Sequence, residues 1–107
     1  MAVKESINSI RKIVKHYADV LRNHQIDPSE VFLFGSYAKG TPREYSDIDV
    51  AVVSGSLSGD RFDDRCALMH LRWDVDVRIE PHPFRPEDFT EDNPEAAEIM
   101  RTGIRIL

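Results

Sequence analysis

Two short apolar runs, joined by a segment that carries a Gly-Ser pair and two closely spaced aspartates, constrain the fold of this chain most strongly. The first run covers residues 31–34 (Val-Phe-Leu-Phe), and the second begins at Ile48 and ends at Val53. Short runs rich in β-branched, aromatic and aliphatic residues are typical of buried strands. The pattern therefore predicts two buried strands separated by a turn.

The segment that follows the first strand carries groups suited to binding phosphate. Gly35 permits a tight exit from the strand and a close approach of the backbone to a ligand. Ser36 suits the N-cap of a helical turn over residues 37–39, where free N–H groups and the serine hydroxyl form an anion site. Lys39 and Arg43 flank this turn, either near a bound triphosphate or as solvated loop charges. A nucleotide-binding turn is the prediction.

Asp47 and Asp49 stand one residue apart at the start of the second strand. Side chains two positions apart on a strand point to the same face, so the two carboxylates repel each other unless a cation lies between them. Their hard oxygen ligands favour Mg²⁺, which keeps waters and substrate phosphates in its shell. The alternative is that Asp47 caps the strand and Asp49 is merely exposed. The whole constellation favours the metal site.

A third carboxylate is predicted from the alternating segment 73–79, which has the pattern of a half-buried strand. Asp74 and Asp76 share one face of this strand. If the strand lies beside that of the paired aspartates, one of them completes a metal-binding triad and accepts the proton of an attacking hydroxyl. We favour Asp76, which lies mid-strand, and keep Asp74 as the alternative. An ordinary exposed Asp–Arg alternation remains the other interpretation.

The Gly-Ser pair, ten intervening residues and then Asp-Ile-Asp resemble the signature of the DNA polymerase β-like nucleotidyltransferase superfamily. The form GSYAKG…SDIDVAVV is similar to its minimal nucleotidyltransferase branch, over roughly residues 31 to 79. The resemblance implies an α/β (α+β) fold, a small mixed β-sheet flanked by helices. It also implies a bound nucleoside triphosphate, ATP by default, and two Mg²⁺ ions.

The resemblance carries roles over to individual positions. Gly35 and Ser36 are expected to contact the triphosphate, and Asp47, Asp49 and Asp76 to bind metal and act in catalysis. The match at Asp76 is the weakest of these, because a second candidate lies so close to it.

Length and composition predict one small domain over residues 1–107. The hydrophobic content of 41% and charged content of 31% are typical of a soluble globular protein. We expect no membrane span and no signal peptide, since no apolar run is long enough. The lone Cys66 forms no internal disulfide, which suits a reducing cytoplasm. The net charge of −5 argues against an extensive nucleic-acid surface.

Two functions follow from these observations. The first, implied by the resemblance, is an enzyme that moves AMP from ATP to a hydroxyl. The small size and acidic charge of the chain favour a small molecule or a protein side chain as the acceptor. Many members of the minimal branch resemble antitoxins encoded beside a HEPN-domain ribonuclease, which are thought to attach AMP to a tyrosine of the toxin. The second is a non-catalytic binding module that sequesters a HEPN-type partner. The sequence does not identify the acceptor or the nucleotide base that the enzyme selects.

The remaining segments are predicted to be scaffold. Apolar residues at three- and four-residue spacing predict a long amphipathic helix over residues 3–21, and further helices are expected over residues 60–71 and 94–101. Residues 104–107 are a candidate edge strand or docking segment. His82 has no second His or Cys at ligand spacing, so we assign it no metal-binding role.

Overall fold

The computed structural model describes residues 6–43 and 46–107. The helices and strands are, in chain order, α1 (Ile7–Asn23), β1 (Glu30–Phe34), α2 (Ser36–Lys39), β2 (Ile48–Val53), α3 (Arg61–Leu71), the 3₁₀ helix η1 (Arg72–Asp74), β3 (Ile79–Phe84), the 3₁₀ helix η2 (Pro86–Asp88), α4 (Pro94–Thr102) and β4 (Ile104–Arg105). The strands form a four-stranded sheet in the order β3-β2-β1-β4. Because β1 is antiparallel to β2 and β4 whereas β3 is parallel to β2, the sheet is mixed, as predicted.

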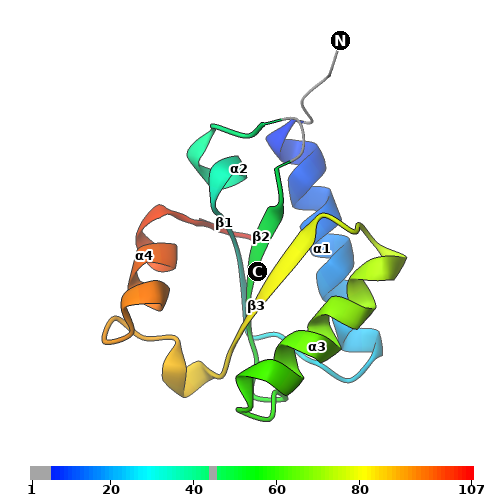
Figure 1. The fold of residues 1–107 in the computed structure, drawn as a ribbon, viewed down its shortest axis with the longest axis vertical. Coiled ribbons are helices and arrows are strands. Elements are labelled where there is room, and N and C mark those ends of the chain that lie inside the picture. The colour runs from blue at the N-terminus through cyan, green and yellow to red at the C-terminus, as the bar shows by residue number, and fades with distance from the viewer. Residues whose placement is uncertain (1–5, 44–45) are drawn as a thin grey trace.

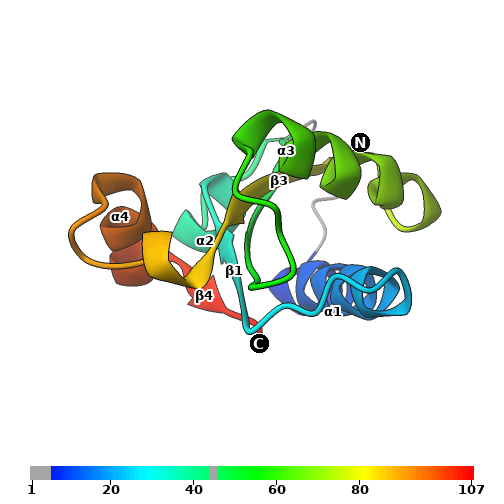
Figure 2. The same cartoon turned by 90° about the horizontal axis from the view of Figure 1, so that it is seen from below.

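Helices cover both faces of this sheet. α1 and α3 lie on one face and α4 lies on the other (Figures 1 and 2). Two clusters of buried side chains fill the spaces between the layers, one under α1 and α3 and one that includes Ala96 and Ile99 of α4. Alternation along β2 divides its side chains between them: Val50 and Val52 enter the first cluster, and Ala51 and Val53 the second.

The long first helix is confirmed as an amphipathic helix that packs by one stripe on the core. Ser6 caps it by accepting a hydrogen bond from the Ser9 backbone N–H at 3.2 Å, and the predicted start at residues 3–5 lies outside the described residues. Tyr17 is fully buried and donates its hydroxyl to the Leu68 carbonyl at 2.6 Å, which ties α1 to α3. Burial raises the pKa of Tyr17, so the hydroxyl keeps the proton that it donates.

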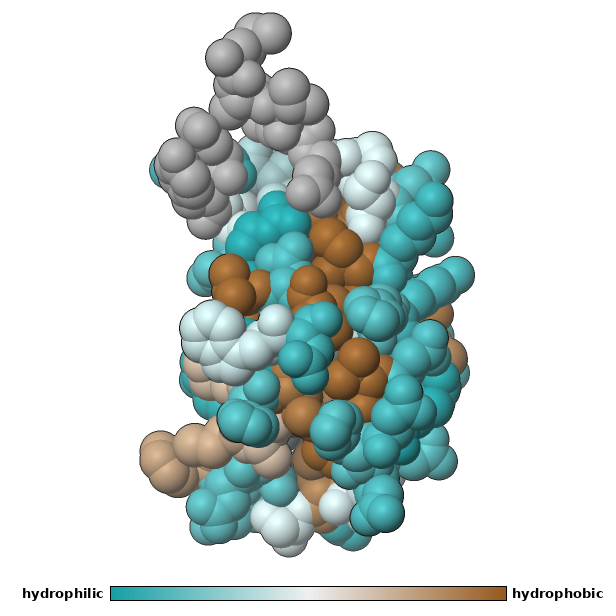
Figure 3. Space-filling view, turned by 90° about the vertical axis from the view of Figure 1, so that its right-hand side faces the viewer, coloured by the Kyte–Doolittle hydropathy of each residue, from teal (hydrophilic) through white to brown (hydrophobic). Residues whose placement is uncertain are grey.

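The surface on the α1 and α3 side is not uniformly polar. Figure 3 shows a strip of apolar surface between polar margins on this side of the molecule. Ile13, Val20 and Val75 are half-buried hydrophobic residues that pack against the core cluster of this face. No helix in the described part of the chain is long and apolar enough to cross a membrane.

The prediction of a strand over residues 73–79 is wrong. η1 ends at Asp74, and a turn follows in which the N–H groups of Val75 and Asp76 both donate to the Arg72 carbonyl at 2.9 Å. β3 begins only at Ile79. The alternating pattern was misleading because a turn of polar and apolar residues has the same spacing as a half-buried strand.

β3 includes two prolines, Pro81 and Pro83, which disfavour a strand in sequence-based reasoning. The pairing explains why they fit. Ile48 donates to the Arg78 carbonyl and Ser54 donates to the Phe84 carbonyl, so the N–H groups of even-numbered residues of β3 face β2. The nitrogen atoms of the two prolines point away from β2, at the edge of the sheet, where no hydrogen bond is lost. At the other edge β4 pairs with β1, as the edge-strand alternative predicted.

Candidate active site

The turn after β1 has a backbone that only glycine adopts easily. Gly35 has φ 76° and ψ −151°, a region of the Ramachandran plot that is essentially restricted to glycine. There is also no room for a side chain, because a Cβ added at Gly35 would clash with Oδ2 of Asp49 and would lie 3.1 Å from its Cγ. The glycine therefore allows a strand-borne carboxylate to lie directly against the turn.

α2 begins at Ser36, with Gly35 in the capping position and no side-chain cap. The prediction of Ser36 as the N-cap is thus wrong by one residue, because the glycine conformation already turns the chain into the helix. The Ser36 hydroxyl makes no hydrogen bond to any described residue and is half-buried. Lys39 is exposed in the last turn of α2 and has no ion-pair partner within residues 6–43 and 46–107.

Asp49 lies at the centre of the site, in the second position of β2. Its neighbours in the sheet are Phe34 of β1 and Glu80 of β3. The Asp49 side chain is 27% exposed, so it is neither buried nor freely solvated. Oδ2 faces Gly35, and Oδ1 lies 3.4 Å from Nε2 of His82. The alternative of a merely exposed Asp49 does not describe this environment.

Asp47 immediately precedes β2 and is exposed. It makes no hydrogen bond or ion pair with the described residues. One carboxylate just before β2 and one at its second position supply hard oxygen atoms of the kind that Mg²⁺ selects. Because Mg²⁺ is usually bound by one or two carboxylates together with substrate phosphates and waters, Asp47 and Asp49 fit that ion without a closed protein cage.

Asp76 lies in the turn before β3 and not in a strand. Its carboxylate accepts hydrogen bonds from the backbone N–H, Nε and Nη2 of Arg78 at 2.9, 3.0 and 2.7 Å. These bonds, the side-chain ones foremost, outweigh burial and hold the pKa of Asp76 below its usual range. Asp74, the alternative, is exposed at the end of η1. Among the described residues no three His, Cys, Asp or Glu side chains form a group that could hold a metal ion, so the third carboxylate remains a prediction.

The register of β3 brings two further polar residues to Asp49 that sequence reasoning did not place there. Glu80 is directly opposite Asp49, and its carboxylate pairs with Arg65 and lies 3.7 Å from Nη1 of Arg72. His82 is the residue that contacts Asp49. The register that pairs Ile48 with Ile79 would have predicted that Glu80 and His82 lie near Asp49. That register cannot be assigned until the position of β3 in the sequence is known.

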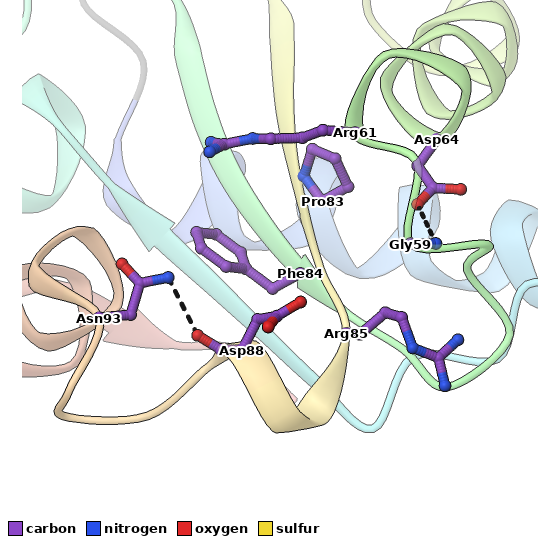
Figure 4. A pocket seen from close by; sticks show the side chains of 8 residues that line it. All are labelled: Gly59, Arg61, Asp64, Pro83, Phe84, Arg85, Asp88 and Asn93. Carbon is purple, nitrogen blue, oxygen red and sulfur yellow. Dashed lines mark hydrogen bonds between the residues drawn. The ribbon is translucent and has the colours of Figure 1, made fainter.

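A separate cavity of about 130 Å³ lies at the other end of the sheet, where β2 and β3 end (Figure 4). It is lined by Gly59, Arg61, Asp64, Pro83, Phe84, Arg85, Asp88 and Asn93. The Asp64 carboxylate accepts bonds from the Ser58 N–H, the Ser58 hydroxyl and the Gly59 N–H at 2.9, 2.8 and 3.0 Å. The Asp64 carboxylate is thus hydrogen-bonded by its own chain, which indicates a structural role.

A mixed sheet with a glycine turn at the end of one strand and paired aspartates at the start of the next is the architecture of a nucleotidyltransferase fold. The chain belongs to the nucleotidyltransferase domain family, whose family model matches residues 7–99. The resemblance identified from the sequence is thereby confirmed.

The chain is also similar to individual proteins. A protein of Methanocaldococcus jannaschii named "putative protein adenylyltransferase" is 33% identical over 87 residues, which cover 76% of this chain. The match spans only 58% of the length of that relative.

Solved structures share the fold. A crystal structure of a toxin–antitoxin with AMP-PNP has a TM-score of 0.61 and 19% identity, over 91% of this chain and 72% of the other. A protein of Sulfolobus solfataricus called a "putative nucleotidyltransferase" has a TM-score of 0.60 and 20% identity, over 98% of this chain and 89% of the other.

Proposed function

We propose that this chain transfers a nucleoside monophosphate, AMP from ATP, to a hydroxyl group and releases pyrophosphate. The observation that carries the proposal is the half-buried Asp49 carboxylate, which lies against the Gly35 turn with a second carboxylate, Asp47, two residues away. Membership of the nucleotidyltransferase domain family and similarity to a protein named for adenylyl transfer support it.

The residues around the turn provide donors for the triphosphate. The Ser36 hydroxyl has no partner among the described residues, and the positively charged Lys39 is exposed beside it. In the proposed complex, Gly35 allows the backbone to approach the phosphates closely, Ser36 donates to them and Lys39 neutralises part of their charge. These contacts orient the α-phosphorus toward the acceptor.

Asp47, Asp49 and the predicted third carboxylate, Asp76, would hold the two Mg²⁺ ions. Bound there, the ions would neutralise charge on the triphosphate and align the reacting oxygens. For Asp76 to take part, its carboxylate must leave Arg78, which occupies it in this structure.

The transfer itself forms one bond and breaks one. The acceptor oxygen bonds to the α-phosphorus, the bond from that phosphorus to the bridging oxygen of the β-phosphate breaks, and pyrophosphate leaves with the electron pair. The acceptor loses its proton to a carboxylate acting as general base, and we assign this role to Asp76 after its release from Arg78.

We further propose that the acceptor is a tyrosine of a HEPN-type toxin and that the chain acts as the antitoxin. The support is the family resemblance and the shared fold with a chain of a solved toxin–antitoxin. The small acidic chain, with a net charge of −5, favours a protein acceptor over a nucleic acid.

The experiment is to incubate the purified protein with α-labelled ATP and Mg²⁺, alone, with any co-encoded partner protein, and with a purified HEPN-type toxin. The proposal predicts label on the toxin, located on a tyrosine by mass spectrometry and absent with Asp49→Asn. Label on another acceptor would refute the partner but keep the activity. Tight binding of the toxin without transfer of any nucleotide would instead support the binding-module alternative.

A further inference from the structure

His82 occupies a position in the site that its place in the sequence does not reveal. It lies mid-way along β3, opposite Ala51 of β2, on the same face of the sheet as Asp49. Its side chain is 24% exposed, close to the 27% of Asp49, so both groups are partly shielded from water. A polar contact between them is therefore weakened less by solvent than a contact at the open surface.

The imidazole ring of His82 packs against an aromatic ring from β1, the strand on the other side of β2. Phe34 of β1 and His82 of β3 meet edge to face, with 4.9 Å between ring centroids and an interplanar angle of 64°. Ala51 is opposite His82 and has only a methyl group, which leaves room for the ring to reach toward Asp49. Phe34 directly precedes Gly35, so the turn and the ring are tied to the same strand end.

The geometry of the polar contact predicts which group donates. Nε2 of His82 lies 3.4 Å from Oδ1 of Asp49. A carboxylate oxygen is the acceptor in such a contact, so a hydrogen bond between the two groups requires Nε2–H of His82 as the donor. The other oxygen, Oδ2, faces Gly35. The Asp49 carboxylate thus has His82 beside Oδ1 and the Gly35 turn beside Oδ2, and these two neighbours limit rotation of the carboxylate group.

We propose that His82 is a positioning residue that orients the Asp49 carboxylate for metal binding. The inference rests on the proposed function, because it assigns a task to a carboxylate that we propose binds Mg²⁺. Carboxylates that ligate metals are themselves generally hydrogen-bonded, and loss of such an outer partner typically costs about 10–100-fold in metal affinity or activity. His82 acts through Asp49 and needs no contact with the metal or the nucleotide.

The test compares variants that separate hydrogen bonding from packing. His82→Leu keeps an apolar group against Phe34 and removes the donor, whereas His82→Gln supplies an amide N–H at a similar distance from the backbone. The matched control is His70→Leu, because His70 is exposed and contacts no described polar partner. Mn²⁺ is titrated into each protein with a saturating non-hydrolysable ATP analogue, and bound metal is measured by electron paramagnetic resonance.

We expect His82→Leu to weaken Mn²⁺ binding by about 10–100-fold, His82→Gln to bind within about threefold of wild type, and His70→Leu to match wild type. Wild-type affinity in His82→Leu would overturn the inference, as would equal weakening in His82→Gln, which would indicate packing alone. Asp49→Asn separates the two proposals. If Asp49→Asn binds Mn²⁺ as tightly as wild type, the proposed metal site itself is wrong. If Asp49→Asn binds more weakly but His82→Leu binds as tightly as wild type, only the role of His82 is wrong.

A second readout needs no metal. Long-range ¹H–¹⁵N spectra report which imidazole nitrogen carries the proton in the neutral ring. The geometry predicts the Nε2–H tautomer for His82. The Nδ1–H tautomer would overturn the inference, because Nε2 would then have no hydrogen to donate to Asp49.

Discussion

Two carboxylates lie at opposite ends of β2 and have opposite relations to the fold. Asp64 of α3 is 7% exposed and accepts three hydrogen bonds from Ser58 and Gly59 in the loop that follows β2. Asp49, near the start of β2, has one long contact with His82 and faces a glycine. One carboxylate is saturated by its own chain and the other keeps most of its lone pairs unused.

The two carboxylates differ in how many hydrogen bonds they accept, which fits a structural role for Asp64 and the metal-binding role that we propose for Asp49. Burial alone would raise the pKa of Asp64, but the hydrogen bonds from Ser58 and Gly59 and the charge of Arg85 outweigh it and lower that pKa. The fold thus stabilises the Asp64 anion. At Asp49 the fold fixes the position of the carboxylate but provides only one polar contact among the described residues, as the proposed metal site requires. The predictions below test this contrast.

The largest expected effect is the loss of activity on Asp49→Asn. Removing the charge should lower the rate of nucleotide transfer by about 10³-fold, the scale of removing one charge-stabilising group. The stability should change by less than about 1 kcal/mol, since Asn retains the volume and can accept from His82. Rate is followed by label transfer from α-labelled ATP and stability by urea unfolding. A variant that retains the wild-type rate would assign Asp49 to the scaffold.

Asp76→Asn tests the third carboxylate, with Asp74→Asn as its matched control. If Asp76 acts as general base, its variant should lose about 10²-fold in rate, and the exposed Asp74 should be replaceable without effect. A large loss with Asp74→Asn and none with Asp76→Asn would transfer the role to the alternative. Glu80→Gln belongs in the same series, because Glu80 is the acidic residue opposite Asp49.

Asp64→Asn should affect stability and spare the rate. The amide cannot accept all three hydrogen bonds, and losing bonds to a charged, buried acceptor costs about 2–3 kcal/mol. The neighbouring Asp63→Asn is the control, because Asp63 is exposed and should change stability by less than about 0.5 kcal/mol. Urea unfolding measures both. Equal stabilities of the two variants would contradict the structural role of Asp64.

Gly35→Ala should disturb the turn and Asp49 together. The positive φ alone costs about 1–3 kcal/mol for a residue with a side chain, and the new methyl group displaces the Asp49 carboxylate. We expect a loss of stability of that size and a loss of Mn²⁺ binding. Gly55→Ala is the control, since a Cβ there meets nothing within 4 Å. Unchanged Mn²⁺ binding in Gly35→Ala would show that the glycine turn does not position Asp49.

The smallest expected effect is on acid stability. Because the folded-state pKa of Asp64 is lowered, its charge contributes stability that is present above the unfolded pKa and is lost as the pH falls through the folded one. The stability difference between wild type and Asp64→Asn should therefore shrink as the pH falls from 7 to 3, which urea unfolding at each pH measures. A difference that stays constant or grows over this interval would contradict the lowered pKa.

The sequence predicted the elements that have a strong local pattern. The apolar run before Gly35 became β1, the run from Ile48 to Val53 became β2 with the same bounds, and the spacing of apolar residues in the first segment became α1. β1 and β2 are short apolar runs and α1 has apolar residues at helical spacing, so the residues of each element predict it without knowledge of the tertiary fold.

The third strand could not be located in the same way. Pro81 and Pro83 argue against a strand unless it is known to lie at a sheet edge, and that knowledge comes only from the tertiary fold. The strand was predicted to begin at residue 73, whereas β3 begins at Ile79. The register with β2 was therefore not predicted, nor was the position of Glu80 and His82 near Asp49. Asp64 lies in a helix that was predicted correctly. Its hydrogen bonds from Ser58 and Gly59 of the preceding loop could not be predicted, because they depend on how the loop folds against the helix.

The measurement that tests the central claim most directly is a comparison of ATP labelled at the α-phosphate with ATP labelled at the γ-phosphate. The account predicts transfer of the α-label to an acceptor, no transfer of the γ-label, and loss of transfer in Asp49→Asn but not in Asp64→Asn assayed where it is folded. Transfer of the γ-label, or α-label transfer that survives Asp49→Asn, would contradict the claim that this site moves a nucleotide through Asp49.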